Sequence, residues 1–340
     1  MENPMTNNLP HVYVIQGRGA RDFAACESVL EKLPARLSNL PFIADPAQII
    51  EAAGDADALI SSSSPVTREV MSALSNLKVV VRTGVGFDVI DVAAATELGV
   101  IVVNIPDLWI REVANHAIGL LLAINRKILV LDQQIRSGVW TPSVPGPYTG
   151  ALHGETVGIV GLGNIGSAFA RRIAGFEMKL IACDPYVSDE HFAKLGVERV
   201  SLEELAARAD YISVHTLLND ETRHLIDDAF FKHTKPTAIL INTSRGPVVE
   251  EQAVHRALLA KRLAGAALDV WESEPIAADN ALLNMDNVIA TSHAAYFSSP
   301  AVAQVPGRCG EEVARALRGE RPINVVNKEL FEPGAKRRAM

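Results

Sequence analysis

Cysteine is scarce in this sequence. Only three of the 340 residues are cysteine, namely Cys26, Cys183 and Cys309, and no two of them form a CxxC motif. An odd number of widely spaced cysteines argues against a disulfide framework. We therefore expect buried apolar thiols in a reducing compartment, and no metal site is expected.

Long apolar runs are also missing. No run reaches the length of about 20 residues that a membrane-spanning helix needs. The N-terminal stretch MENPMTNNLP is polar and lacks the apolar core of a signal peptide. The sequence therefore predicts no membrane association, and the cytoplasm is the expected location.

Positive charge is in short supply as well. The chain has 40 acidic residues against 32 lysines and arginines, which gives a formal net charge of −8. This balance argues against a nucleic acid or an anionic membrane as a partner. The only basic cluster is KRR, from Lys336 to Arg338, and we expect it to be a solvated tail.

The residues that are present predict two domains of the α/β class. Hydrophobic residues make up 48% of the chain, and 340 residues exceed the size of one average core. From residue 11 to residue 105, apolar runs such as HVYVIQ, DALIS, LKVVVRT and GVIVVN alternate with helical segments such as RDFAACESVLEKL. This alternation predicts a parallel sheet built from βα units. A long helix is predicted to follow, from about Trp109 to Gly138.

A second unit begins at ETVGIVGLGNIG. Six strands are predicted in it: Val157–Val160, Lys179–Cys183, Tyr211–Val214, Ala238–Ile241, Ala266–Val270 and Val288–Ala290. Six parallel strands in two halves predict the doubly wound fold that binds dinucleotides. The last helix, PAVAQVPGRCGEEVARALRG, is expected to return to the first domain.

The predicted architecture is therefore two doubly wound parallel-sheet domains. A flavodoxin-like substrate domain is expected over residues 10–106 plus 298–330. A Rossmann NAD-binding domain is expected over residues 107–297, including the long inter-domain helix.

A glycine-rich turn predicts the cofactor site. Gly161, Gly163 and Gly166 form GxGxxG between a predicted strand and a predicted helix. In that setting the glycines allow a tight turn, the approach of a pyrophosphate and close packing of helix on strand. Asp184 follows the next strand, where its carboxylate can bind both ribose hydroxyls and repel a 2′-phosphate, so NAD is predicted rather than NADP. The alternative is that Asp184 only caps the turn before Pro185.

Three residues at the ends of successive strands predict the chemistry. Arg245, Glu274 and His293 follow the fourth, fifth and sixth strands, where the ligand of an open α/β sheet is bound. Each alone could be an ordinary strand-end residue. Together they fit hydride transfer beside a carboxylate, because the planar fork of Arg245 can grip a 2-keto acid. A histidine ordinarily titrates near pH 6.5, which suits His293 to proton transfer, and Glu274 can hold its other ring nitrogen.

At this point the chain resembles the D-isomer-specific 2-hydroxyacid dehydrogenase family along nearly its whole length. The matching motifs are VGIVGLGNIG, INTSRGPVVEEQAVHRAL, GAALDVWESEP, SHAAYFS and the loop RTGVGFDVID. The resemblance implies that Arg245, Glu274 and His293 are catalytic and that the backbone N–H groups of Val85 and Gly86 bind the substrate carboxylate. It implies that Asp269 contacts the nicotinamide end of the cofactor, and that the long helix forms a homodimer. The complete set of expected cofactor-binding residues is Gly161, Gly163, Asn164, Ile165, Gly166, Asp184, Thr243 and Asp269.

Within the family, CDPYVSDE, WESEP and HAAYFS are most similar to the branch of the C-terminal-binding-protein dehydrogenases. That branch adds a second hypothesis, an NAD(H)-binding corepressor-like interaction protein. A third alternative is a glyoxylate or hydroxypyruvate reductase. A phosphorylated substrate is less expected, because Ser61 stands where phosphoglycerate-oxidising relatives have an arginine. A separate departure from the family is Leu217, which replaces the proline of the HxPL turn in a loop of the cofactor wall.

Two aromatic residues are candidates for the wall of the substrate pocket. Tyr296 lies three residues past His293, and Trp109 opens the predicted long helix. The alternative is that both rings pack in the domain interface. The sequence thus predicts an NAD-dependent oxidoreductase that interconverts a 2-keto acid and a D-2-hydroxy acid.

Overall fold

The computed structural model describes residues 9–17, 22–141 and 150–338. Its internal contacts divide the chain into two compact units. Unit 1 comprises Met1–Trp109 and Ser298–Met340, and unit 2 comprises Ile110–Phe297. The assignment of unit 1 to the substrate stays a prediction.

Unit 1 contains a five-stranded sheet in the described residues, with the order β2-β1-β3-β4-β5. Every strand pair is parallel, so the predicted flavodoxin-like arrangement is confirmed. The strands are β1 (His11–Ile15), β2 (Arg36–Leu40), β3 (Ala58–Ser61), β4 (Val79–Arg82) and β5 (Ile101–Val103). The helices are α1 (Ala24–Leu30), α2 (Pro46–Ala52), α3 (Arg68–Ala73), α4 (Val92–Glu97) and α12 (Ser299–Leu317).

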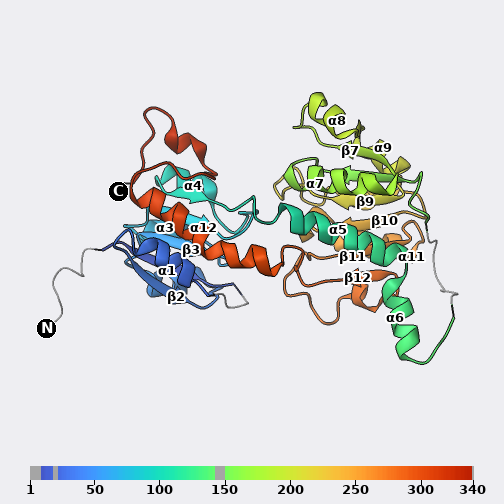
Figure 1. The fold of residues 1–340 in the computed structure, drawn as a ribbon, viewed down its shortest axis with the longest axis horizontal. Helices are drawn as coiled ribbons and strands as arrows, with labels where there is room; N and C mark the ends of the chain where they lie inside the picture. The colour runs from blue at the N-terminus through green and yellow to red at the C-terminus, as the bar shows by residue number, and fades with distance from the viewer. Residues whose placement is uncertain (1–8, 18–21, 142–149, 339–340) are drawn as a thin grey trace. The chain divides into compact units, whose positions relative to one another are not determined.

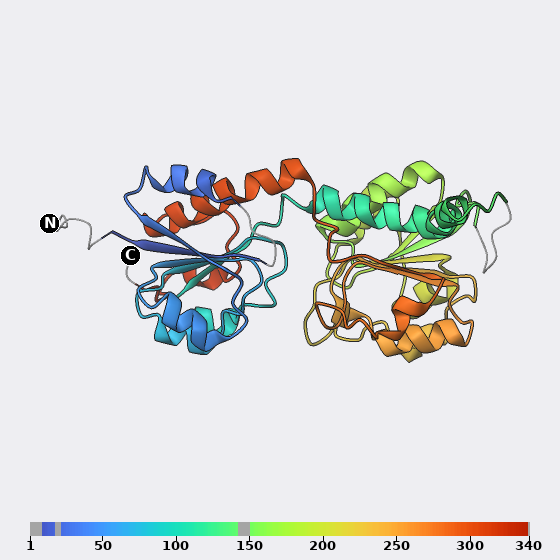
Figure 2. The same ribbon diagram turned by 90° about the horizontal axis from the view of Figure 1, so that it is seen from below.

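Local sequence explains where these elements begin. Strands β3 and β5 consist of buried residues that are apolar except for Ser61, as expected for a parallel sheet covered on both faces. Asp45, Thr67 and Asp91 each accept a hydrogen bond from a backbone N–H in the first turn of α2, α3 and α4, respectively. Helices cover both faces of the sheet (Figure 2), and α12 packs on α1 and β4 (Figure 1). The last helix therefore joins the N-terminal unit.

The expectation of a solvated basic tail is wrong for Arg338. Its Nη1 donates to the carbonyls of Leu74 at 2.6 Å and Leu77 at 3.0 Å, and its Nη2 donates to Met71 at 2.8 Å. Its Nε donates to the Leu98 carbonyl at 3.1 Å. The end of α3 leaves carbonyls without helical partners, and the guanidinium supplies several donors to them at once.

Unit 2 contains a seven-stranded sheet in the described residues, with the order β12-β11-β10-β9-β6-β7-β8. All six strands predicted from the sequence are present in it and pair in parallel. They are β6 (Thr156–Val160), β7 (Lys179–Cys183), β9 (Tyr211–Val214), β10 (Ile239–Asn242), β11 (Gly265–Leu268) and β12 (Val288–Ala290), with the two-residue β8 (Glu198–Arg199) at one edge. The helices are α5 (Ile110–Asn125), α6 (Ile128–Arg136), α7 (Asn164–Ile173), α8 (Asp189–Leu195), α9 (Leu202–Arg208), α10 (Asp228–Phe231) and α11 (Glu251–Leu259).

The prediction of one long helix from Trp109 to Gly138 is wrong. Two helices, α5 and α6, replace it, and they meet at an angle of 59°. Lys127 has a left-handed φ of 54°, which ends the first helix without glycine or proline. The buried Asn125 side chain exchanges hydrogen bonds of 3.1 and 2.8 Å with the backbone of Gly150 and so fixes the end of α5.

Among the described residues, no single helix is long and apolar enough to cross a membrane. The bent pair α5 and α6 passes that test only by length and composition.

Candidate active site

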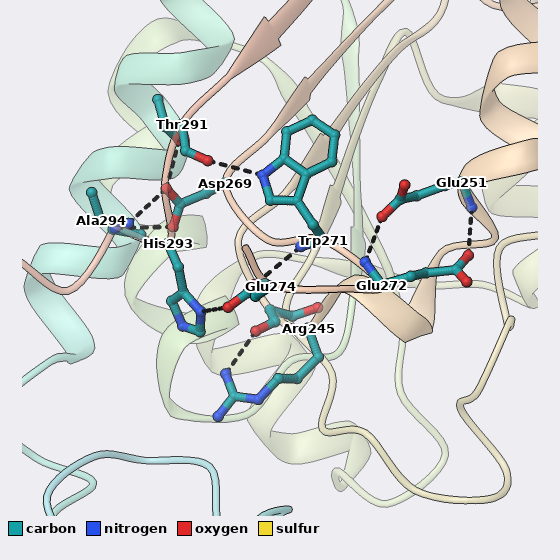
Figure 3. Close-up of polar contacts among 11 residues, drawn as sticks. Arg245, Glu251, Asp269, Trp271, Glu272, Glu274, Thr291, His293 and Ala294 are labelled. Carbon is teal, nitrogen blue, oxygen red and sulfur yellow. Dashed lines mark hydrogen bonds and ion pairs between the residues drawn. The ribbon is translucent and has the colours of Figure 1, made fainter. Parts of the chain in front are cut away.

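Three loops at the carboxyl ends of neighbouring strands hold the predicted catalytic residues (Figure 3). Arg245 follows β10, Glu274 follows β11, and His293 follows β12. These strands are adjacent in the order β12-β11-β10, so the parallel sheet places the three loops side by side. The structure thus brings the three predicted residues to one edge of unit 2.

Glu274 and His293 form a hydrogen-bonded pair. The Nδ1 atom of His293 lies 2.7 Å from Oε2 of Glu274, while Oε1 of Glu274 accepts the backbone N–H of Trp271 at 3.1 Å. Burial opposes ionisation of Glu274, but the bond to His293, the charges of His293 and Arg245, and the Trp271 N–H lower its pKa. A carboxylate only accepts hydrogen bonds, so Nδ1 of His293 must donate, and Nε2 is the ring nitrogen left for proton transfer.

The side chain of His293 is 39% exposed, and that of Glu274 is 35% exposed. The backbone of His293 has a φ of 54°, in the left-handed region that a histidine seldom adopts. An unusual backbone at this position indicates that the surrounding loop holds the residue in place.

Gly246 brings the Arg245 loop against the Glu274 loop. A Cβ atom on Gly246 would lie 1.9 Å from the carbonyl carbon of Trp271 and 2.4 Å from the nitrogen of Glu272. Only glycine permits this approach. The loops are also joined through Glu251, whose backbone N–H donates to Oε1 of Glu272 at 2.7 Å, and whose own carboxylate accepts the backbone N–H of Glu272.

The glycine-rich turn between β6 and α7 has the geometry predicted for a dinucleotide. Gly161 has a φ of +90°, and a Cβ there would meet the nitrogen of Thr216 at 2.8 Å. A Cβ on Gly166 would lie 2.1 Å from the carbonyl oxygen of Gly161, so that position needs glycine for packing of helix on strand. Gly163 differs: a Cβ there would meet no heavy atom of the described residues within 4 Å.

The first turn of α7 faces this open space. Gly163, Asn164 and Ile165 are all at least partly exposed, and Gly163 caps the helix without a side-chain hydrogen bond. The free backbone N–H groups and the helix dipole at such a terminus favour an anion. These residues fit the pyrophosphate of NAD.

Asp184 caps the glycine-rich turn. Its Oδ2 accepts the backbone N–H of Leu162 at 2.7 Å, and its Oδ1 accepts the N–H of Tyr186 at 2.9 Å. Each oxygen keeps a second lone pair, so the turn-capping role and the ribose contact are compatible. Asp184 also lines a cavity of about 360 Å³ with Cys183, Pro185, Arg199, Val200, Ser201 and Glu204.

The hydroxyl group of Thr243 also fits a contact with the cofactor. It is buried to 7% exposure, and its Oγ1 has no hydrogen-bond partner within the described part of the chain. Buried hydroxyls are normally satisfied, so an unsatisfied one at a strand end is the expected sign of a ligand contact. Together with the space at Gly163, this supports the fit of NAD to unit 2.

Asp269 was predicted to contact the nicotinamide end of the cofactor. Its carboxylate has no exposed surface, and it accepts hydrogen bonds from the backbone N–H groups of Ala294 and Ala295, both at 2.9 Å. Contact with the cofactor stays a prediction. The sequence did not predict these hydrogen bonds from the two residues that follow His293.

The predicted substrate residues are divided between the units. Val85 and Gly86 lie in unit 1, in the loop after β4, where Asn104 Nδ2 donates to the Val85 carbonyl at 2.7 Å. Trp109 is 3% exposed, and its indole N–H donates to the Thr83 carbonyl at 3.3 Å. Its contact with the substrate stays a prediction. Tyr296 belongs to unit 2, and its ring meets that of His293 edge-on, with 6.5 Å between the ring centres.

Comparisons with known proteins identify the family. The sequence profile described as "D-isomer specific 2-hydroxyacid dehydrogenase, NAD binding domain" matches residues 118–295. The chain is 40% identical to a glyoxylate reductase of Korarchaeum cryptofilum, over 84% of this chain and 86% of that protein. The chain therefore belongs to the D-isomer-specific 2-hydroxyacid dehydrogenase family, and it is an NAD-dependent oxidoreductase of 2-hydroxy acids.

Other relatives show the range within the family. The chain is 41% identical to the D-3-phosphoglycerate dehydrogenase of Mycobacterium tuberculosis, over 82% of this chain but only 53% of that protein. It therefore spans about half the length of those phosphoglycerate dehydrogenases.

Solved structures give the same architecture. A glyoxylate reductase from Paecilomyes thermophila aligns with a TM-score of 0.85 at 27% identity, covering 95% of this chain and 99% of that one. A D-lactate dehydrogenase from Aquifex aeolicus, complexed with NAD and lactic acid, aligns with a TM-score of 0.83 at 26% identity, covering 93% and 98%. The likeness to the C-terminal-binding-protein branch stays a prediction from the motifs.

Proposed function

We propose that this chain interconverts a 2-keto acid and a D-2-hydroxy acid through Arg245, Glu274 and His293. The observation that supports it most is the 2.7 Å hydrogen bond between His293 Nδ1 and Glu274, beside the charge of Arg245. NAD(H), bound to unit 2, supplies or accepts the hydride.

Arg245 provides the grip on the substrate. Its guanidinium is half-buried, and Nη1 donates to the carbonyl of Ser244 at 2.9 Å, which orients the group. A planar guanidinium can bind the carboxylate and the carbonyl oxygen of a 2-keto acid together. The backbone N–H groups of Val85 and Gly86 are proposed to bind the same carboxylate.

His293 provides the proton. In reduction, Nε2 of the imidazolium gives a proton to the carbonyl oxygen of the substrate; in oxidation, the neutral ring takes it from the hydroxyl. Glu274 holds Nδ1 throughout, and its negative charge stabilises the imidazolium that oxidation forms.

A panel of 2-keto acids with NADH tests this function. We expect NADH oxidation with at least one acid, measured by absorbance. With every accepted acid whose 2-hydroxy product is chiral, we expect the D enantiomer, measured by chiral chromatography. NADH binding without turnover on any acid would instead support the corepressor-like alternative.

Glyoxylate is the specific substrate that the comparisons favour. The 40% identical relative is a glyoxylate reductase. We therefore propose a preference for small 2-keto acids. The ratio of kcat/KM for glyoxylate to that for 2-keto acids with medium apolar side chains tests this preference. A ratio well below one would contradict it and would support an apolar substrate pocket instead.

A homodimer is proposed through the segment that includes α6. This helix has no buried residue, and the segment exposes five large apolar side chains: Ile128, Leu129, Ile135, Val139 and Trp140. An exposed apolar surface of this kind usually marks a protein interface. Analytical ultracentrifugation should show a dimer that Trp140→Glu weakens, whereas a wild-type monomer would contradict the proposal.

The cytoplasm is proposed as the location. All three cysteines are free, and Cys26 and Cys309 are fully buried. Thiols persist in a reducing compartment. Fractionation of cells that produce the protein would test this, and recovery from an oxidising compartment would contradict it.

A further inference from the structure

Asp269 connects three segments of unit 2. Its Oδ1 accepts the hydroxyl of Thr291 at 2.5 Å and the backbone N–H of Ala294 at 2.9 Å, while its Oδ2 accepts the N–H of Ala295 at 2.9 Å. Its carbonyl accepts the N–H of His293 at 2.7 Å. Asp269 therefore holds the chain on both sides of His293 (Figure 3).

This hold bears directly on the backbone of His293. The φ of 54° is unfavourable for a histidine and persists only where neighbouring bonds fix it. Hydrogen bonds to His293, Ala294 and Ala295 all end on one residue. The direction of the imidazole therefore depends on where the Asp269 carboxylate sits.

His116 contacts that carboxylate from α5. Its Nε2 forms a hydrogen bond of 3.4 Å with Oγ1 of Thr291 and an ion-pair contact of 3.5 Å with Oδ1 of Asp269. Because the Thr291 hydroxyl donates to Asp269, Nε2 is the donor in the bond to Thr291. Burial opposes ionisation of Asp269, but bonds from His116, Thr291, Ala294 and Ala295 lower its pKa. A buried carboxylate stays charged only when donors surround it, and His116 is one of them.

The contact between His116 and Asp269 links segments of unit 2 that lie far apart in the sequence. The helix α5 is the first element of unit 2, and the loop with Ala294 and Ala295 leads to its last residue. Asp269 thus ties the first helix of the unit to its last loop.

We propose that His116 is a positioning residue for His293, acting through Asp269. This inference rests on the proposed function of His293 in proton transfer. The role of His116 is indirect, because it acts on His293 through the Asp269 carboxylate. Its N–H fixes the Asp269 carboxylate, and the carboxylate fixes the backbone that aims the imidazole.

Substitutions of equal bulk separate this role from simple packing. His116→Leu keeps much of the volume and removes the donor, while His116→Gln keeps an N–H donor. Asn115→Leu is the matched control, because Asn115 is the exposed neighbour of His116 on the same helix. Thr291→Val removes the second donor to the same oxygen and serves if His116→Leu does not fold.

Steady-state kinetics with NADH give the first readout. A misplaced catalytic group commonly lowers turnover by about 10- to 100-fold, and we expect a fall of this size in kcat for His116→Leu with the KM for NADH little changed. His116→Gln should recover most of kcat, and Asn115→Leu should stay within about twofold of the wild type, as exposed substitutions do. Equal loss in His116→Leu and His116→Gln would show a packing role and overturn the proposal.

Imidazole NMR gives a readout that does not need turnover. The ¹H–¹⁵N signal of the His293 Nδ1 proton, assigned by its loss in His293→Gln, should shift in His116→Leu and return in His116→Gln. This result would stand even if no 2-keto acid were reduced, in which case the proposed function alone would fail. An unchanged His293 signal in folded His116→Leu or Thr291→Val would overturn the positioning role.

Discussion

At the scale of the residue, two glycines near the candidate active site have opposite surroundings. Gly163 borders open space at the start of α7, whereas Gly246 touches the backbone of Trp271 and Glu272. Absence of a side chain therefore has two different uses in the same unit: at Gly163 it leaves room for a ligand, and at Gly246 it lets two loops meet.

Alanine at these two positions should give separable effects. The Cβ of Gly163→Ala meets no described atom, and the φ of −67° is allowed for alanine, so we expect an unchanged Tm. We expect NADH binding to weaken by roughly tenfold, because a methyl group fills the approach to the helix terminus. Gly246→Ala puts a Cβ 1.9 Å from a carbonyl carbon, so the Arg245 loop must move and kcat should fall. Fluorescence titration of NADH, thermal unfolding and steady-state kinetics measure the three quantities. Normal NADH binding in Gly163→Ala would count against a pyrophosphate at this turn.

Asp184 gives a second prediction for a single residue. Asp184→Ser should weaken NAD binding and narrow the preference over NADP, because each lost charge-assisted hydrogen bond is worth about 1.5–3 kcal/mol at most. Dissociation constants for both cofactors measure this. If neither constant changes, the carboxylate only caps the turn through Leu162 and Tyr186.

At the scale of the element, the hydrogen bonds of Arg338 to unit 1 predict that this residue stabilises the fold. Arg338→Ala should leave the carbonyls of Met71, Leu74, Leu77 and Leu98 without this donor group, at a cost of about 1–3 kcal/mol. We expect a lower Tm for Arg338→Ala and an unchanged Tm for Lys336→Ala, whose side chain is exposed. Equal Tm values for the two variants would show that the tail adds no stability.

The elements also show how far the sequence could predict the fold. The central strands and α7 were predictable because their apolar runs and glycines are local signals. The edge strand β2, with the sequence RLSNL, has no apolar alternation, and β8 has only two residues. The break between α5 and α6 depends on Asn125 contacting Gly150, a contact between residues 25 positions apart.

The residues of the candidate active site also differ in whether the sequence could predict them. Arg245, Glu274 and His293 were predictable because each follows a recognisable strand. His116 and Thr291 were not, because their relation to Asp269 depends on how α5 packs against the ends of β11 and β12. A lone histidine on a helix carries no such signal in the sequence.

At the scale of the whole molecule, the carboxylates of the site link function to acid stability. The pKa values of Asp269 and Glu274 are lowered from 3.8 and 4.5, respectively. The stability from such groups is present above the unfolded pKa and is lost as pH falls through the folded value.

We therefore expect the Tm of the wild type to fall as pH drops from 5 toward 3. The fall should be smaller in Glu274→Gln, because glutamine cannot titrate. Thermal unfolding followed by circular dichroism across this range measures the difference. Parallel curves for the two proteins would show that the Glu274–His293 pair adds nothing to acid sensitivity.

His293, held by Glu274, is the residue that we propose transfers the proton in reduction of a 2-keto acid. The most direct measurement is single-turnover oxidation of NADH by the best substrate, in the wild type and in His293→Gln. We expect the variant to bind NADH normally and to lose roughly 100- to 10,000-fold in rate, the usual contribution of a positioned acid–base group. A rate near that of the wild type, with NADH bound, would contradict proton transfer by His293 and leave it a structural residue.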